Sequence, residues 1–333
     1  MHQTTEEPPA QEPALSRRLL ARAAVGAAAT ATVSAGLVAG LPGEATAATG
    51  RRRKKRRHKH HRHHHATTPT PPPVVITPPL VPEERSLLVL ERFTGGWSPT
   101  LGDEVAAAGG IDRWFAGQLD PAGIPDDFYT ASSSWWFSLL ASTDELWARD
   151  RAGTEGMWVA SANYERWSML RRMYSQRQVL ETMASFWEHH LHVPVDADGV
   201  GLFRSDYGRM IRDHALGRFD TLLQAAITHP AMGVYLGNAV STKKAPNENL
   251  GRELLELHTV GRASGYTEDD VKSSARILTG YRVDEWKTWS VLYDPTAHWT
   301  GPVSVLGFSD PNAAADGQAV TAAYLSYLAH HPG

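Results

Sequence analysis

The side chains best suited to chemistry lie on one predicted helix, residues 248 to 260. At about 100° per residue, its polar side chains Asn249, Arg252, Glu253 and Glu256 share one narrow arc. Two neighbouring carboxylates beside an Arg and an Asn can support proton transfer or bind a cation, because one acid raises the pKa of the other. A solvent-exposed face with an i,i+4 pair between Arg252 and Glu256 explains the same pattern.

A histidine from an earlier segment is the fifth candidate. In the segment FWEHHLHVP, His190 continues an apolar helical stripe, whereas Glu188, His189 and His192 are interpreted as surface residues. His258, within the apolar arc of the later helix, is interpreted as a core residue. The candidate catalytic residues are therefore His190, Asn249, Arg252, Glu253 and Glu256, and a divalent metal is a possible cofactor of such a set.

The chain around these residues carries clear helix boundaries. Asn247 is a suitable N-cap, and Gly261 is placed to end the helix in a left-handed turn. Thr267 and Asp270 form a capping-box pattern that starts a second helix, which ends near Gly280. The pattern predicts two packed helices with the polar arc on the first.

These two helices also carry a family resemblance. The segments NENLGRELLELHTVG and GYTEDDVKSSARILTGY resemble the signature of the bacterial family catalogued as domain of unknown function 1800, DUF1800. The resemblance runs from about Leu87 to the end of the chain and places the family's usual Trp and His at Trp187 and His190. It implies no established activity. Relatives continue beyond the final His-Pro step, which predicts a truncated C-terminus, and their gene neighbours suggest an exported protein partner.

Composition separates the chain into a basic leading part and an acidic body. Residues 66 to 333 hold 21 Lys and Arg against 32 Asp and Glu, a net charge of −11. Cysteine is absent, which excludes disulfides, thiolate ligands and a cysteine nucleophile. The sequence contains no P-loop, Rossmann glycine pattern, GxSxG or HExxH motif, which argues against the corresponding nucleotide, hydrolase and zincin chemistries.

Residues 1 to 47 are typical of a twin-arginine export signal. Arg17 and Arg18 precede an Ala-rich run from Ala23 to Leu41, and a small-residue cleavage site follows. The alternative is an uncleaved anchor, but the Ala, Gly and Thr content makes the run a weak membrane span. We predict an exported protein, extracellular or associated with the envelope, with no stable transmembrane span after cleavage.

Residues 48 to 82 are predicted to be a disordered arm and linker. Residues 51 to 65 carry nine Lys and Arg and six His, and residues 69 to 82 hold seven prolines, which favour a stiff spacer. The basic run suits anionic cell-wall polymers, lipid headgroups or metal ions, while a solvated tail is the alternative. No specific nucleic-acid partner is expected after an export signal.

Residues 83 to 333 are predicted to form a mainly α domain, a multi-helix non-coiled bundle with a small β insertion near 281 to 306. The aromatic residues between 131 and 150 are interpreted as core rather than as a carbohydrate platform.

Two functions fit this organisation. The first is a metal-assisted or acid/base hydrolytic enzyme of the cell envelope that uses the five candidate residues. The alternative is a non-catalytic envelope protein that acts in binding or as a scaffold. A third interpretation makes the polar arc purely architectural, with Arg252 locking helices together.

Overall fold

The computed structural model describes residues 83–132 and 134–332. The chain divides into two units, residues 1–74 and 75–333, and every described residue belongs to the second. The predicted export signal, basic arm and proline-rich linker lie outside the described residues.

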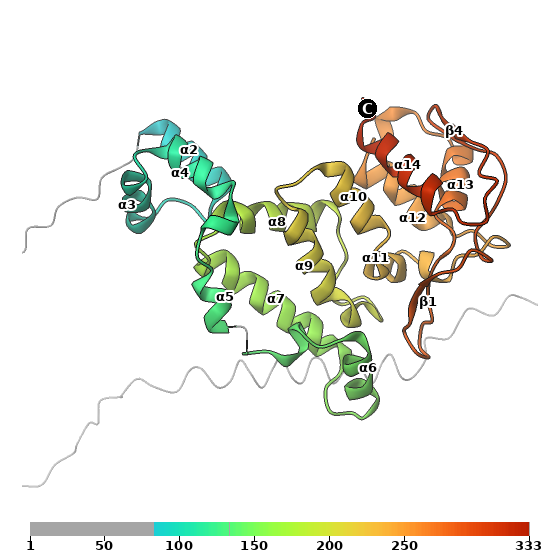
Figure 1. The fold of residues 1–333 in the computed structure, drawn as a ribbon, viewed down its shortest axis with the longest axis horizontal. Coiled ribbons are helices and arrows are strands. Elements are labelled where there is room, and N and C mark those ends of the chain that lie inside the picture. Colours follow the sequence, from blue (N-terminus) through green and yellow to red (C-terminus); the bar gives the residue numbers. More distant parts are fainter. Residues whose placement is uncertain (1–82, 133, 333) are drawn as a thin grey trace, which may run out of the picture. The chain divides into compact units, whose positions relative to one another are not determined.

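The described chain is mainly helical, as predicted, with two small sheets near its C-terminal end (Figure 1). The α-helices are α2 (Glu84–Phe93), α3 (Pro99–Ala107), α4 (Ile111–Gln118), α5 (Asp127–Ser132), α6 (Thr143–Arg151), α7 (Met157–Tyr174), α8 (Gln178–His190), α9 (Arg204–His214), α10 (Phe219–Ile227), α11 (Pro230–Tyr235), α12 (Glu248–Glu253), α13 (Glu268–Ile277) and α14 (Gln318–Ala329). Short 3₁₀ turns are η1 (Pro121–Gly123), η2 (Phe137–Leu139), η3 (Val200–Leu202), η4 (Asn238–Val240) and η6 (Arg262–Ser264), and η5 (Leu254–His258) is a π turn.

The largest hydrophobic core joins segments from α6 to α14. Its fully buried members include Tyr207, Ile211, Leu223, Leu254 and Leu325, which come from α9, α10, η5 and α14. Helices α2, α3 and α4 form a smaller cluster with Val179 of α8. Burying apolar surface is the main driving force for such packing, so the second cluster attaches the N-terminal helices to the rest of the domain.

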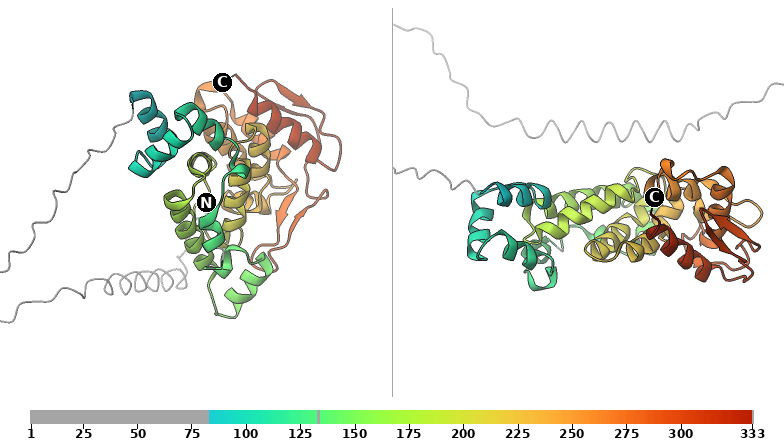
Figure 2. Two further views of the ribbon diagram at one scale, coloured as in Figure 1. Left: turned by 60° about the vertical axis from the view of Figure 1, so that its left-hand side comes forward. Right: turned by 90° about the horizontal axis from the view of Figure 1, so that it is seen from above.

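The predicted small β insertion is present and consists of two antiparallel hairpins. Strand β1 (Tyr281–Val283) pairs with β2 (Val291–Tyr293), and β3 (Val303–Val305) pairs with β4 (Phe308–Asp310). Strand β3 packs on α13 and β4 packs on α14, whereas β1 packs on α11 and η4. Figure 2 shows both hairpins, in orange and red, at the C-terminal end of the described chain. No helix among the described residues is long and apolar enough to cross a bilayer.

The capping box predicted at Thr267 and Asp270 forms. The Thr267 hydroxyl accepts from the Asp270 N–H at 3.2 Å, and the Asp270 carboxylate accepts from the Thr267 N–H at 2.8 Å. The Ser-x-x-Gln spacing of Ser175 and Gln178 also predicts a capping box, at the start of another helix, and that prediction is wrong. The Ser175 hydroxyl instead accepts from the Arg177 N–H at 3.1 Å, because α8 begins only at Gln178.

Candidate functional site

The predicted helix 248–260 forms in two parts with different geometry. Asn247 caps α12 as expected, and its side chain accepts from the Asn249 N–H at 2.9 Å. After Glu253 the backbone widens into the π turn η5, which holds more residues per turn and rotates the following side chains. Regular helical spacing predicts Leu257 on the apolar arc beside His258. In the structure Leu257 is instead 59% exposed, whereas His258 is buried as predicted.

The Arg252 guanidinium binds a partner outside its own helix. Its Nη1 and Nη2 donate to the two carboxylate oxygens of Glu268 at 2.7 and 2.6 Å, and Glu248 lies 3.6 Å away. Hydrogen bonds from Arg252 hold the pKa of the Glu268 carboxyl below its usual range. The predicted i,i+4 partner of Arg252, Glu256, is not used. Arg252 is about one third exposed, so this contact ties the start of α13 to α12 at the surface.

The remaining members of the arc have separate environments. Glu256 accepts from the Tyr266 hydroxyl at 2.8 Å and pairs with Arg262 at 3.1 Å. Glu253 is half-buried and has no hydrogen bond or ion pair within the described chain, and Asn249 is exposed. The two carboxylates of the predicted arc therefore do not share a polar partner.

His190 is held by the π turn rather than by the arc. Its Nε2 lies 3.0 Å from the carbonyl oxygen of His258, and the Nδ1 of His258 lies 2.9 Å from the carbonyl oxygen of His190. To donate to these carbonyl groups, His190 must carry a proton on Nε2 and His258 must carry one on Nδ1. Burial lowers the pKa of His258 to about 4 and so keeps its ring neutral. This reciprocal pair fastens the end of α8 to η5.

The structure describes all five candidates and joins none of them to another by a hydrogen bond or ion pair. Across residues 83–132 and 134–332, no three His, Asp or Glu side chains gather in an arrangement that could hold a metal ion. A shared catalytic pocket for these residues stays a prediction.

A buried charge network lies elsewhere, between α7, α8 and α9. The Glu181 carboxylate, 1% exposed, accepts from Arg171 Nε at 2.7 Å and from Arg212 Nε and Nη2 at 3.1 and 2.9 Å. Both guanidinium groups also lie over the Trp167 ring, at 5.1 and 4.7 Å from its centroid, and Arg171 reaches Asp126 at 2.8 Å. From the sequence alone, Arg212 fits a structural ion pair and a site role equally well, and the structure places it in an ion pair with Glu181.

A second buried pair extends this network along α8. Glu188 accepts from the Tyr164 hydroxyl and lies 3.5 Å from Arg204 Nη2, while the Arg204 guanidinium packs 4.4 Å from the centroid of the Tyr164 ring. Burial raises the pKa of Tyr164 to about 12. The interpretation of Glu188 as a surface residue is therefore wrong, whereas His189 and His192 are exposed as expected. A β-carbon on Gly208 would lie 1.8 Å from the Tyr164 oxygen, so this glycine lets α7 and α9 approach.

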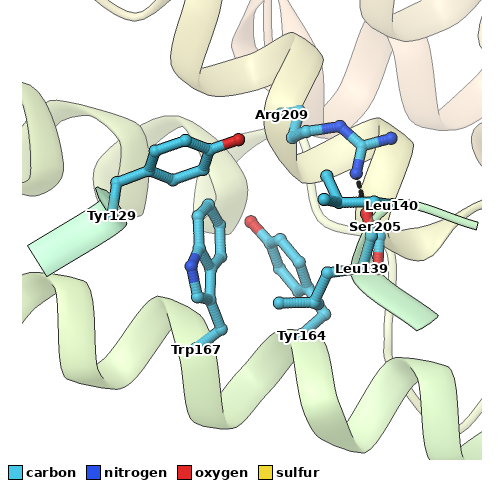
Figure 3. Close-up of a pocket in the computed structure, with 7 residues that line it drawn as sticks. All are labelled: Tyr129, Leu139, Leu140, Tyr164, Trp167, Ser205 and Arg209. Carbon is cyan, nitrogen blue, oxygen red and sulfur yellow. Dashed lines mark hydrogen bonds between the residues drawn. The ribbon is translucent and has the colours of Figure 1, made fainter. Parts of the chain in front are cut away.

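A small pocket opens beside this network (Figure 3). It encloses about 20 Å³, which is room for about one water molecule, and is lined by Tyr129, Leu139, Leu140, Tyr164, Trp167, Ser205 and Arg209. The Ser205 hydroxyl is buried without a hydrogen-bond partner in the described chain. Figure 3 shows the Tyr129 hydroxyl and the Arg209 guanidinium on the same side of the pocket, where Arg209 Nη1 donates to the Leu139 carbonyl.

Exposed side chains, most of them aromatic, lie on or next to the segments that line this pocket. We use "aromatic cluster" for the exposed residues Tyr129, Trp135, Phe137, Leu140 and Tyr174. Trp135 is 55% exposed and lies edge-on to Phe128 and Trp136, with ring centroids 6.0 and 5.7 Å apart. The interpretation of this segment as core holds for Leu139 but is wrong for Trp135, Phe137 and Leu140.

A family model described as "Protein of unknown function (DUF1800)" matches residues 88–333, well over half of the chain. The chain belongs to the DUF1800 family. No curated protein and no solved structure matches it.

The DUF1800 signature segment has a clear structural role in this chain. Gly251 lies against α13, and a β-carbon there would come within 2.8 Å of the Ala275 nitrogen and 3.1 Å of the Val271 carbonyl oxygen. The Ser274 hydroxyl donates to the Gly251 carbonyl oxygen at 3.2 Å in the same contact. A small residue on each helix is what allows this close packing, so Gly251 and Ala275 fix α12 against α13.

Proposed function

We propose that this DUF1800 protein is a non-catalytic binding protein of the cell envelope that recognises polysaccharide through the aromatic cluster. The observation that supports this is the exposure of Tyr129, Trp135 and Phe137 on segments that also line an apolar pocket. Figure 3 shows the Tyr129 hydroxyl and the Arg209 guanidinium at one side of that pocket. Exposed apolar patches of this kind mark ligand-binding or interaction surfaces.

The chemistry of a sugar ring suits this surface. The C–H faces of a pyranose pack on aromatic rings, whose faces carry negative charge, while its hydroxyl groups require donors and acceptors at the edge of the contact. Trp135 and Tyr129 supply exposed rings. Arg209, which is 37% exposed, supplies hydrogen-bond donors beside the pocket, whereas the Ser205 hydroxyl is buried beneath it. The pocket itself holds about one water, so a glycan would lie across its mouth rather than inside it.

The basic arm complements this surface in the proposal. Residues 51–65 would hold the exported protein near anionic wall polymers by salt-dependent attraction, and the aromatic cluster would contribute salt-independent contacts. Deletion of residues 51–65 should then lower retention in envelope fractions at low salt while leaving binding to neutral glycans unchanged.

The test is co-sedimentation of the full chain with insoluble cell-wall polysaccharide. Ring packing is worth about 0.5–1.5 kcal/mol, so Trp135→Ala should weaken binding by about two- to tenfold. Trp286→Ala is the matched control, because Trp286 is 49% exposed and belongs to the β1–β2 hairpin region. Equal binding by the wild type and Trp135→Ala would contradict the proposed function.

One observation favours hydrolysis as a second candidate function. Glu253 is a half-buried carboxylate without a polar partner in the described chain, which leaves it free to act in acid/base chemistry. Glu253→Gln should then abolish hydrolysis of envelope polymers without unfolding the protein. Normal turnover by this variant would remove Glu253 from any mechanism.

A further inference from the structure

Helix α7 has an apolar surface on both of its sides. One side is buried in the domain and includes Tyr164 and Trp167. The opposite side carries Trp158, Met169 and Met173, which are 63%, 65% and 62% exposed. No described residue covers these three side chains. A surface helix normally presents polar groups to water, so this solvent side has the composition of an interface, in which Trp, Met and Arg are enriched.

The exposed residues form a continuous line along the helix. We use "α7 stripe" for the six residues that fall within about 100° of each other at helical spacing. They are Trp158, Ala162, Glu165, Arg166, Met169 and Met173.

The residues of the α7 stripe are arranged symmetrically about its midpoint, and the two members of each symmetric pair are complementary in size or charge. Trp158 lies as far from the midpoint as Met173, and Ala162 lies as far from it as Met169. The midpoint falls between an acid and a base, Glu165 and Arg166. A two-fold axis at this midpoint brings each residue opposite its counterpart on a second copy, which is the condition for an isologous interface.

We propose that a second copy of this chain docks on the α7 stripe, with the two α7 helices antiparallel about a two-fold axis between residues 165 and 166. Each Trp158 ring then packs on Met173 of the partner copy, a favourable contact between an aromatic ring and a polarisable sulfur. Each Met169 fits against the small Ala162, which leaves room for the longer side chain and lets the two helices approach.

The charged pair at the centre selects this arrangement. Glu165 is exposed and has no hydrogen bond or ion pair within the described chain, and Arg166 contacts only the side-chain oxygen of Asn163, at 2.9 Å. In the antiparallel dimer, Glu165 of each copy faces Arg166 of the other, which makes two ion pairs. A parallel dimer would instead place like charges together, which destabilises association.

Charge complementarity favours a second copy over other occupants of the stripe. A lipid surface would gain nothing from the alternation of Glu165 and Arg166 at the midpoint and would be weakened by the acid. The symmetric order of residues along the α7 stripe is matched by a second antiparallel copy of the same helix, and not by the sequence of an unrelated protein. The aromatic cluster shares no residue with the α7 stripe. Phe137 belongs to η2, which contacts α7 where Tyr164 and Trp167 are buried, and Tyr174 alone lies on α7, beside Met173 at its end.

The first experiment measures association of the full chain by sedimentation over about 1 to 100 µM, a range that brackets weak specific interfaces. Glu165→Arg and Arg166→Glu each place like charges opposite each other twice, so each should weaken the dimer by at least about tenfold. The double variant carrying both changes restores opposite charges and should restore the dimer. A wild-type monomer over the whole range, or no recovery in the double variant, overturns the proposal.

The second experiment uses the absence of cysteine from the chain. Ala162→Cys with Met169→Cys should form an intermolecular disulfide on mild oxidation. The two positions are about 10 Å apart along one helix, which is too far for an intrachain bond. Each single variant is the control, because in an antiparallel dimer its cysteine faces a residue without a thiol. Cross-linking of Ala162→Cys alone would show a parallel arrangement and overturn the proposal.

The two proposals fail separately. A monomeric protein that still binds polysaccharide through Trp135 contradicts the dimer alone, and a dimer that binds no polysaccharide contradicts the proposed function alone.

Discussion

Replacement of Glu181 by Gln should reveal how much of the fold depends on the buried charge network. The change keeps the size of the side chain but removes the negative charge between Arg171 and Arg212, which are 2% and 9% exposed. The amide nitrogen of Gln is itself a hydrogen-bond donor and would face the N–H donors of Arg171 or Arg212. At least one guanidinium therefore loses its hydrogen bonds to residue 181. Asp126 then remains as the nearby counter-charge of Arg171.

The expected cost follows from the burial of these groups. Loss of one partner from a buried ion pair costs about 3–5 kcal/mol, because the remaining charge is left uncompensated in a medium of low dielectric. The total stability of a domain is about 5–15 kcal/mol, so this loss is a large share of it. For a domain of this size the melting temperature should fall by roughly 10 °C.

The assay is urea unfolding followed by circular dichroism, with Glu253→Gln as the matched control. Glu253 has no polar partner in the described chain, so the same chemical change there should leave the unfolding free energy nearly unaltered. A combined Glu181→Gln and Arg212→Met variant should be more stable than the sum of the two single losses predicts, because the charges are removed together. A loss below about 1 kcal/mol in Glu181→Gln would refute the view that this carboxylate holds the three helices together.

Two further predictions concern the packing of the signature segment. Burial lowers the pKa of His258 to about 4 in the folded protein, against 6.5 in the unfolded chain. Between pH 4 and pH 6.5 the unfolded chain therefore binds a proton at His258 that the folded protein does not bind. The unfolding free energy should rise by roughly 3 kcal/mol from pH 4 to pH 6.5, and His258→Phe should flatten this dependence in urea titrations. Gly251→Ala should cost about 1–3 kcal/mol because its methyl group overlaps the α13 backbone. Gly117→Ala, where nothing lies within 4 Å, should be neutral or stabilising, and equal effects of the two alanines would contradict the close contact.

The helical class, the packed pair of helices after residue 247 and the β insertion all follow from local sequence patterns. Capping at Asn247 and Thr267 depends on neighbouring residues only, so it can be predicted without the fold. The exposure of Leu257 could not be predicted. A π turn at Leu254–His258 shifts the helical phase, and periodicity analysis assumes that the phase is constant.

The charge network and the aromatic cluster were missed for a different reason. Arg171 is 10 residues and Arg212 is 31 residues from Glu181, and each lies on a different helix where it resembles an ordinary surface charge. Only the packing of α7, α8 and α9 brings them together. Trp135 was assigned to the core because aromatic residues usually bury large areas, and no local pattern distinguishes an exposed ring from a buried one.

The central claim is that this protein binds through the aromatic cluster rather than through the polar arc of its signature helix. Hydroxyl-radical footprinting of the full chain, with and without soluble peptidoglycan oligosaccharides, compares the two surfaces in one experiment. We predict that the oligosaccharides protect Tyr129 and Trp135 and leave Trp286 unchanged. Protection of residues 248–258, with Tyr129 and Trp135 modified as fast as in the free protein, would contradict the account.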